Sequence, residues 1–316
     1  MTILEGTVNR RRALAMGGSV AATLVGLDAS TAVARAQEQA VPGQQGTIDQ
    51  KAVERALGTT GQMMPGGVFR VSLPRTDLHV TVRGVPLKPA FALGSYAAFV
   101  PAGGAAMMMG DLVLLDAEVN AVMSGLFQGG LSVTALHNHL LEMSPHVMYL
   151  HYLGHGNAAH LAMALRRALA ASGTPFGQTP ATPTMGALPI DTTRIGAILG
   201  HAGKIKGGVL QVSIPRAETI TERGMVLPPA LGVTTAFNFQ PTGAGKAAIT
   251  GDFVLIAPEV NPVARTLHAH GIAVTAIHNH ALADEPRLFY MHFWAHDDAV
   301  RLAQGLHAAL DHTHHR

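Results

Sequence analysis

The chain has 316 residues, of which 48% are hydrophobic and 13% charged, a balance that favours a well-packed globular protein and argues against a disordered one. Its pI of 9.1 comes from the N-terminus: without residues 1–36, which hold four arginines and two acidic residues, the chain has 18 basic (22 less 4) and 18 acidic (20 less 2) residues. This neutral remainder predicts no nucleic-acid partner, and the lack of cysteine excludes disulfides and thiolate metal sites.

The first 36 residues have the pattern of an export signal. Three adjacent arginines at 10–12 precede an apolar run at 13–27 that is too short to span a bilayer, and an A-x-A cleavage sequence follows at 34–36. The adjacent arginines are typical of a twin-arginine signal, so we expect a periplasmic or secreted protein with no membrane anchor after cleavage. An amphipathic or disordered basic tail is the alternative interpretation.

The rest of the chain contains one unit twice. The sequence VFRVSLPR at 68–75 matches VLQVSIPR at 209–216, and a histidine-rich block at 133–156 matches another at 274–297, each offset by 141 residues. Such a fixed register predicts a duplication and a pseudo-symmetric arrangement of two copies. The expected parts are an N-terminal extension at 37–47, copies at 48–171 and 190–312, a Pro/Thr/Gly linker at 172–189 and a histidine-containing tail at 313–316.

Within a copy, residue periodicity predicts the order α-β-β-β-β-α-β-β-α, which is an α+β unit. In the first copy the expected elements are a helix over 49–57 ended by Gly58, strands near 68–73, 79–85, 93–100 and 107–115, a helix from Asp116 to the glycines at 129–130, two strands in the histidine block, and a last helix from Asn157 to Leu169. In the second copy, Pro258 and Gly271 should begin and end the middle helix, and the last helix should run from Asp297–Asp298 to Leu310.

Each copy carries four histidines at the same spacing in its histidine block. Residues two apart on a strand share a face, so a hairpin of two strands across the 140–145 loop would bring both pairs of a copy onto one face. The fourth histidine precedes a helix N-terminus, which disfavours its cationic form. Neutral imidazoles suit zinc or copper. The candidate metal ligands are His137, His139, His151 and His155 in the first copy and His278, His280, His292 and His296 in the second.

Two other interpretations of the histidines stay open: a hydrogen-bonded polar network, and acid–base chemistry without a metal. Glu142 and Asp284 are weak candidates for a ligand or general base, although water-facing loop positions also explain them. The repeated aspartates Asp111 and Asp252 are interpreted as structural turn residues.

Three further pairs of repeated residues have structural interpretations. Turn and helix-start positions explain Glu118 and Glu259, the opposite strand face explains Asn138 and Asn279, and ion pairing explains Arg75 and Arg216.

The paired blocks VTALHNH with MYLHYLGHG and VTAIHNH with YMHFWAHDDA resemble the LppY/LpqO family of bacterial exported proteins and lipoproteins. The resemblance covers both copies and implies a duplicated exported protein, with no catalytic residues to carry over. This chain lacks the cysteine that lipoprotein members acylate.

Three functions follow as hypotheses. The first is a soluble exported protein that binds a divalent transition metal, either once in each copy or once between the copies. The second is a metal-dependent hydrolase with three histidine ligands and an open water position. The third is a binding protein for a small molecule or cell-envelope component, with structural histidines. No phosphate-binding glycine loop or G-x-S-x-G motif supports a nucleotide or serine-hydrolase site.

Overall fold

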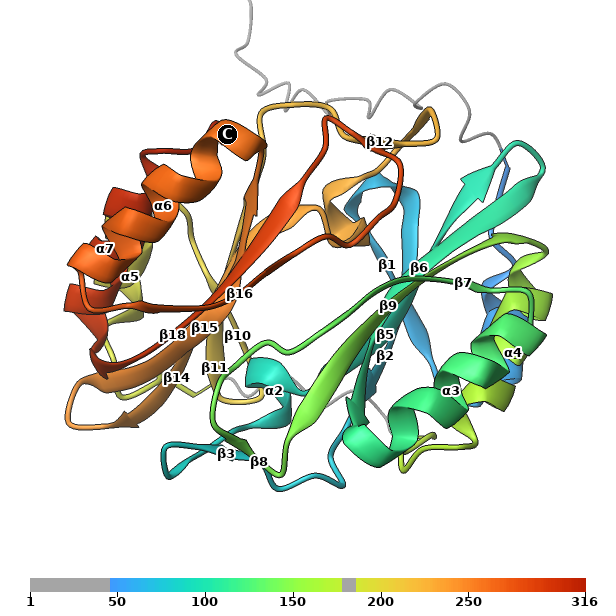
Figure 1. Cartoon of the computed structure of the whole chain (residues 1–316), viewed down its shortest axis with the longest axis horizontal. Coiled ribbons are helices and arrows are strands. Elements are labelled where there is room, and N and C mark those ends of the chain that lie inside the picture. The colour runs from blue at the N-terminus through green and yellow to red at the C-terminus, as the bar shows by residue number, and fades with distance from the viewer. Residues whose placement is uncertain (1–45, 178–185) are drawn as a thin grey trace, which may run out of the picture. The chain divides into compact units, whose positions relative to one another are not determined.

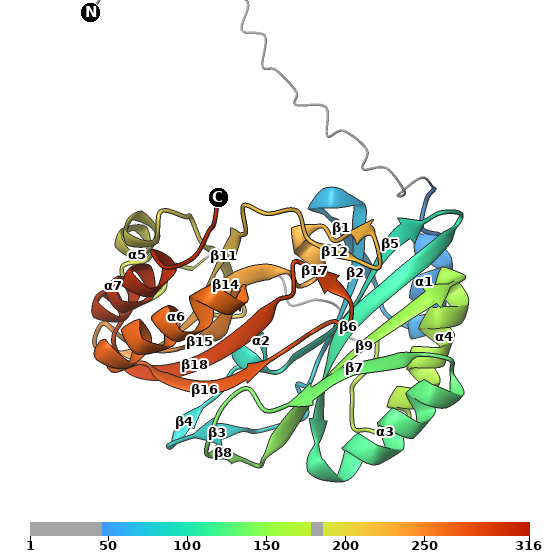
Figure 2. The same cartoon turned by 45° about the horizontal axis from the view of Figure 1, so that its top comes forward.

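Each copy folds as a six-stranded antiparallel sheet with helices on one face, so the predicted duplicated α+β fold is confirmed (Figures 1 and 2). The computed structural model describes residues 46–177 and 186–316, all within one compact unit. The predicted export signal lies outside these residues, as do most of the extension at 37–47 and the middle of the linker. None of the helices in the described ranges has the length and apolarity needed to cross a membrane.

The first copy contains, in chain order, α1 (Gln50–Leu57), β1 (Gly61–Met64), the 3-10 turn η1 (Pro65–Gly67), β2 (Val68–Pro74), β3 (Thr81–Val82), β4 (Val85–Pro86), α2 (Pro89–Ala92), β5 (Gly94–Ala102), β6 (Ala105–Leu115), α3 (Asp116–Gln128), β7 (Ser132–His137), β8 (Met143–Ser144), β9 (Val147–Gly156) and α4 (Ala158–Leu169). The large sheet has the order β1-β2-β5-β6-β9-β7, and β4, β3 and β8 form a small sheet.

The second copy repeats this plan with α5 (Thr192–Leu199), β10 (Lys204–Lys206), β11 (Val209–Pro215), β12 (Thr221–Glu222), β13 (Met225–Val226), the 3-10 turn η2 (Pro229–Leu231), β14 (Thr234–Gly243), β15 (Lys246–Leu255), α6 (Ala257–Ala269), β16 (Ala273–His278), β17 (Asp284–Glu285), β18 (Phe289–Asp298) and α7 (Ala299–Leu310). Its sheets have the orders β10-β11-β14-β15-β18-β16 and β13-β12-β17.

Helix ends follow the local sequence. Asp49 accepts a hydrogen bond from the Ala52 amide to begin α1, and Gly58 ends this helix in the left-handed conformation, as predicted. The predicted helix from Asp116 is confirmed as α3, in which Asp116 is the first helical residue and Leu115 is at the N-cap. The Leu115 amide donates a hydrogen bond to the Glu118 side chain at 2.8 Å. A residue of the first helical turn thus pairs with a backbone N–H at the N-terminus of the helix.

The predicted strand near 79–85 is wrong in extent, because this segment forms the two-residue strands β3 and β4 around a turn at Arg83 and Gly84. Both turn residues have positive φ, which a continuous strand does not accommodate. The short elements β1, α2 and β8 were not predicted, since none is long enough to produce a hydrophobic period.

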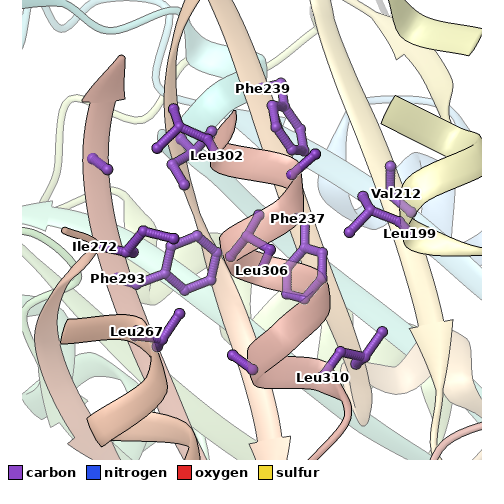
Figure 3. Packing of buried hydrophobic residues seen from close by; sticks show 14 of the residues in the cluster. Leu199, Val212, Phe237, Phe239, Leu267, Ile272, Phe293, Leu302, Leu306 and Leu310 are labelled. Carbon is purple, nitrogen blue, oxygen red and sulfur yellow. The ribbon is translucent and has the colours of Figure 1, made fainter. Parts of the chain in front are cut away.

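One face of each sheet packs against the helices. Alternate strand residues such as Phe69, Val71 and Leu73 meet α1, α3 and α4 in the first copy. Figure 3 shows the equivalent core of the second copy, where Phe237 and Phe293 pack against Leu306 of α7. This alternation directs the remaining residues of each strand to the other face.

The other face of each sheet packs against the other copy through apolar clusters that contain residues of both copies. One cluster joins residues such as Tyr96 and Met107 to Val254 and Tyr290, and another joins residues such as Phe91 to Trp294. The ring centroids of Phe91 and Trp294 lie 6.1 Å apart, edge to face. These contacts bring the histidine-bearing faces of the two copies together.

A buried arginine anchors the strand–helix junction of each copy, as predicted. The Arg75 guanidinium is fully buried and contacts Glu118 at 2.7 Å and Asp77 at 2.9 Å. Burial opposes the charge on Arg75, but the two carboxylates outweigh it and raise its pKa. Arg216 repeats the arrangement with Glu259 and Glu218.

Candidate metal centre

Six of the eight predicted histidines converge where the copies meet. The hairpin prediction is confirmed: β7 pairs antiparallel with β9 so that His137 lies opposite Tyr149, and β16 pairs with β18 so that His278 lies opposite Tyr290. The converging rings are His137, His139 and His151 from the first copy and His278, His280 and His292 from the second.

The rings of the two copies interleave. The ring centroids of His137 and His278 lie 3.4 Å apart. His139 crosses to within 3.7 Å of the His292 centroid, and in the same way the centroid of His280 lies 3.8 Å from that of His151. The second histidine of each H-N-H motif therefore joins the histidines of the other copy.

Hydrogen bonds between the copies hold this crossing in place. Thr134 donates its hydroxyl to the His280 carbonyl, and Thr275 donates to the carbonyl of His139. The Asn279 amide donates to the Thr134 carbonyl at 2.9 Å, and the Asn138 amide reaches the carbonyl of Thr275 at 3.4 Å. These contacts agree with the structural interpretation of the two asparagines.

Backbone carbonyls fix the protonation of three rings. The Nδ1 atoms of His137, His278 and His292 lie 3.0, 3.1 and 2.8 Å from the carbonyl oxygens of Asn138, Asn279 and Gly251. A carbonyl oxygen only accepts, so Nδ1 carries a proton, and in the neutral ring Nε2 presents its lone pair. This orientation is the one that metal-ligating histidines adopt when a carbonyl holds their other nitrogen.

Several nitrogen and oxygen atoms of the centre that could bind a metal have no hydrogen-bond partner within the described parts of the chain. They are Nε2 of His139, His278, His280 and His292 and Oδ1 of Asp111 and Asp252, all buried. Nε2 of His151 lies 2.9 Å from Nε2 of His137, so these two nitrogens are within hydrogen-bond distance of each other. Since His137 carries its proton on Nδ1, its Nε2 would be the acceptor. Buried polar atoms are normally satisfied, and a group of lone pairs directed at one place fits an electron-pair acceptor such as a metal ion.

Two aspartates belong to the centre, which corrects their interpretation as turn residues. Asp111 lies on β6 opposite His151, and Asp252 lies on β15 opposite His292. The Asp111 carboxylate is 3.8 Å from His151 Nε2 and 3.9 Å from His139 Nε2, while Asp252 Oδ1 is 3.0 Å from His292 Nδ1. Both lie within long strands and not in turns, so their side chains project from one face of the sheet.

These donors form four groups that could hold a metal ion, with all ligand atoms of a group within 4.8 Å of one another. Two groups mix the copies: His137 with His151, His278 and His280, and His137 with His139 and His292. Two combine a carboxylate with histidines of its own copy: Asp111 with His139 and His151, and Asp252 with His278 and His292.

Burial keeps five of the six imidazoles neutral. It lowers the pKa of His137 to about 4 and that of His278 to about 2, helped in both cases by repulsion from His292. Burial also lowers the pKa of His139, His151 and His280. Neutral rings are the form that donates to a metal, so the centre is prepared for binding near pH 7.

Burial acts differently on the two carboxyl groups. Burial, followed by repulsion from Asp252, raises the pKa of Asp111 well above its usual value. At Asp252 burial is outweighed by electrostatic attraction to His292, 3.0 Å away, and the pKa is lowered. The difference follows from distance, because Asp252 contacts its histidine while Asp111 stands almost 4 Å from each of its own.

The fourth histidine of each block lies outside the centre. His155 is exposed near the end of β9, where burial and then Arg223 lower its pKa, and His296 is exposed and 2.9 Å from the Thr242 hydroxyl. Each is four residues beyond the third histidine, or about 13 Å along a strand. Strand alternation puts His155 and His296 on the same sheet face as the third histidines. They are too far along the strand to belong to any of the metal-ligand groups.

The two weak candidates for a general base are also engaged elsewhere. Glu142 forms an exposed ion pair with Arg83 at 2.7 Å, and Asp284 contacts Arg287 at 2.6 Å and accepts from the Leu288 amide. Neither belongs to a metal-ligand group of the described chain. Asp111 and Asp252 are the carboxylates that reach the histidines.

A cavity of about 620 Å³ adjoins the centre and is lined by residues of both copies. Its wall includes His139, His151, His280 and His292 together with both aspartates of the centre. The sequence did not predict this cavity, because it forms only between the two sheets. A ligand in it could reach the histidines directly.

Comparison with known proteins gives a family but no activity. No curated protein matches the sequence significantly. A trimeric bacterial microcompartment shell protein, PduB, matches at 12% identity over 80% of this chain and 89% of its own, with a TM-score of 0.19 that carries no argument about fold or function. The family model described as Domain of Unknown Function (DUF1259) matches residues 51–171 and again residues 193–312. The chain therefore belongs to this family and contains its domain twice.

Proposed function

We propose that the protein binds a divalent transition metal, zinc or copper, in a centre shared by its two copies. The observation that carries the proposal is the set of buried Nε2 atoms without partners, two of them on rings whose Nδ1 protons are fixed by carbonyls. A purely hydrogen-bonded histidine network does not explain these atoms, because neighbouring lone pairs repel unless a proton or cation lies between them.

The donor set supports a shared centre over one confined to each copy. His137 and His151 would be joined by His278 and His280 of the other copy in one set, and His137 and His139 by His292 in the other. Imidazole nitrogen with carboxylate oxygen suits zinc and copper, and Asp111 and Asp252 would complete either set. The symmetry allows two ions.

A metal-dependent hydrolase is the second candidate, and the adjoining cavity is the observation that favours it. A catalytic ion keeps a coordination position open to water or substrate, and the cavity reaches four of the six histidines. Asp111 or Asp252 would replace the two weak candidates Glu142 and Asp284 as the carboxylate near that position. In this case the histidines bind the ion and a carboxylate holds or moves the proton of the attacking water.

We also propose that the protein works outside the cytoplasm as a member of the LppY/LpqO family. The arginine-rich N-terminal pattern at 1–36 and the two repeated histidine motifs support this proposal. Cell fractionation of the full-length protein and of a variant with Arg10, Arg11 and Arg12 replaced by lysine would check it: export should be lost in the variant.

Metal titration tests the proposed function. After treatment with a chelator, the protein should take up one or two equivalents of zinc or copper, and its midpoint of thermal unfolding should rise. Free metal at 100 times the dissociation constant would stabilise the fold by about 2.7 kcal/mol, because the ion binds only the folded state. A protein that takes up no stoichiometric metal, with an unchanged unfolding midpoint, would exclude both metal-based functions.

A further inference from the structure

Two cations of the cavity wall form no ion pair with a carboxylate in the described parts of the chain, although the charge of Arg70 acts on Asp111 across the cavity and partly offsets the rise in its pKa that burial causes. Arg70, half-buried on β2, uses one guanidinium nitrogen to reach the Ala230 carbonyl at 3.2 Å, and Lys206 at the end of β10 forms no ion pair. The contrast is with Arg75 and Arg216, each of which is held by two carboxylates. Arg70 and Lys206 come from different copies and line the same cavity.

The Arg70 side chain is held in one orientation. Its guanidinium carbon lies 3.6 Å from the centre of the Tyr96 ring, and the Ala230 carbonyl fixes one of its edges. A guanidinium held in this way keeps further N–H donors for a planar oxyanion. Lys206 is close enough that Arg70 helps, after burial, to lower its pKa. An anion between the two groups would relieve this repulsion.

The cationic pair is a difference between the copies and does not follow from the duplication. At the equivalent positions, Gln211 takes the place of Arg70, and Met64, which pairs with Val68 as Lys206 pairs with Val209, takes that of Lys206. Gln211 donates its side-chain amide to the Ala90 carbonyl instead. The symmetric histidine centre is therefore joined to an asymmetric cavity, which would bind an unsymmetric molecule in one direction.

We propose that this cavity binds a small molecule through an oxyanion group, a carboxylate or a phosphate, held by Arg70 and Lys206. The volume of about 620 Å³ is within the range of small-molecule sites. Arginine binds both kinds of oxyanion through paired N–H donors. The rest of the molecule would extend towards the histidines and aspartates in the same wall. This inference goes beyond metal binding, because it depends on the two cations and not on the ion.

Calorimetric titration with inorganic phosphate and with succinate, in low-salt buffer, tests the proposal on metal-free and zinc-treated protein. One of the two anions should bind once per chain, and which one binds identifies the group. Arg70→Gln, which introduces the residue found in the other copy, should weaken binding at least roughly tenfold, since it removes a charged hydrogen-bond donor. Lys206→Met should weaken it less. Lys204→Met is the matched control on the same strand, outside the cavity wall, and should have no effect.

The outcomes separate this proposal from metal binding. If neither anion binds either form of the protein, or if Arg70→Gln binds the anion as well as the wild type, the proposal is wrong. If anion binding requires zinc but not Arg70, the ion itself is the partner and the proposal is again wrong. If the protein takes up no metal yet binds an anion in a manner that depends on Arg70, the proposal stands and the metal function fails. Circular dichroism of each variant, with matching zinc uptake, shows whether the fold is intact.

Discussion

Replacing His137 and His278 together with alanine is expected to weaken zinc or copper binding by at least about a hundredfold, since even partners of ligands are worth 10–100-fold in affinity. These two rings are stacked at the centre, 3.4 Å apart, and His137 belongs to both of the groups that mix the copies. Their loss would leave neither of these two groups complete. Competition titration against a chelating dye measures the change.

The matched control is the double variant His155→Ala and His296→Ala. These residues come from the same repeated motif but lie exposed and outside the centre, so metal affinity should stay unchanged. If both double variants lost the same metal affinity, the six buried histidines would not be the metal site. Unfolding curves of the metal-free proteins are needed beside the titrations, because a lost fold would imitate a lost site.

Single replacements examine the crossing between the copies. His280→Ala removes a ring from the second copy, but its nearest histidine centroid is that of His151 in the first copy, at 3.8 Å. His280→Ala should therefore change the absorption spectrum of a cobalt or copper ion that is bound beside His151 of the first copy. His139→Ala should produce the equivalent change at His292, whose centroid lies 3.7 Å away.

Glu259→Gln is expected to lower the free energy of unfolding by about 3 kcal/mol, the lower end of the usual cost of breaking a buried pair, because Arg216 keeps its second, partly exposed partner, Glu218. Glu259 contacts the buried Arg216 at 2.7 Å and also accepts hydrogen bonds from the amides of Ile256 and His314. It therefore joins the helix α6, the segment directly after β11 that carries Arg216, and the C-terminal tail. Urea unfolding monitored by circular dichroism measures the loss.

Glu142→Gln is the control for this prediction. Glu142 also pairs with an arginine at 2.7 Å, but both side chains are more than half exposed, at 58% and 60%. Solvent screens such a pair, so the free energy of unfolding should hardly change. A cost for Glu259→Gln as small as that for Glu142→Gln would contradict the anchoring role given to the buried arginines.

Duplication made the core of the candidate site predictable from the sequence. The H-N-H motif and the third histidine recur with identical spacing, and strand periodicity places them on one face, as the pairing of β7 with β9 shows. Parity does not say how far along a strand a side chain lies. For this reason His155 was grouped with His137, although about 13 Å of strand separates it from His151.

The carboxylates of the centre were missed because their proximity depends on strand register. Asp111 is 40 residues before His151 in the sequence, and only the pairing of β6 with β9 puts the two opposite each other. One signal was present: Asp111 interrupts an otherwise apolar strand, and Asp252 repeats it at the equivalent position. A buried charge repeated inside apolar strands indicates a partner more strongly than a turn.

The crossing of the copies could not be predicted from one unit. The repeated pattern describes a hairpin, and it left open whether each copy binds its own ion or both share one. The contacts of Thr134 and Asn279 between the copies form only once the two sheets face each other, because their hydrogen bonds join residues about 145 positions apart. The cavity and its cations depend on the same contact.

Anomalous diffraction at the zinc absorption edge, from crystals grown with zinc, tests the central claim most directly. The account predicts a peak bonded to imidazole nitrogens of both copies, at roughly 2.0–2.1 Å from each ligand. A peak confined to the exposed histidines, such as His155 or His314 of the tail, or no peak among the six buried rings at saturating zinc, would contradict it.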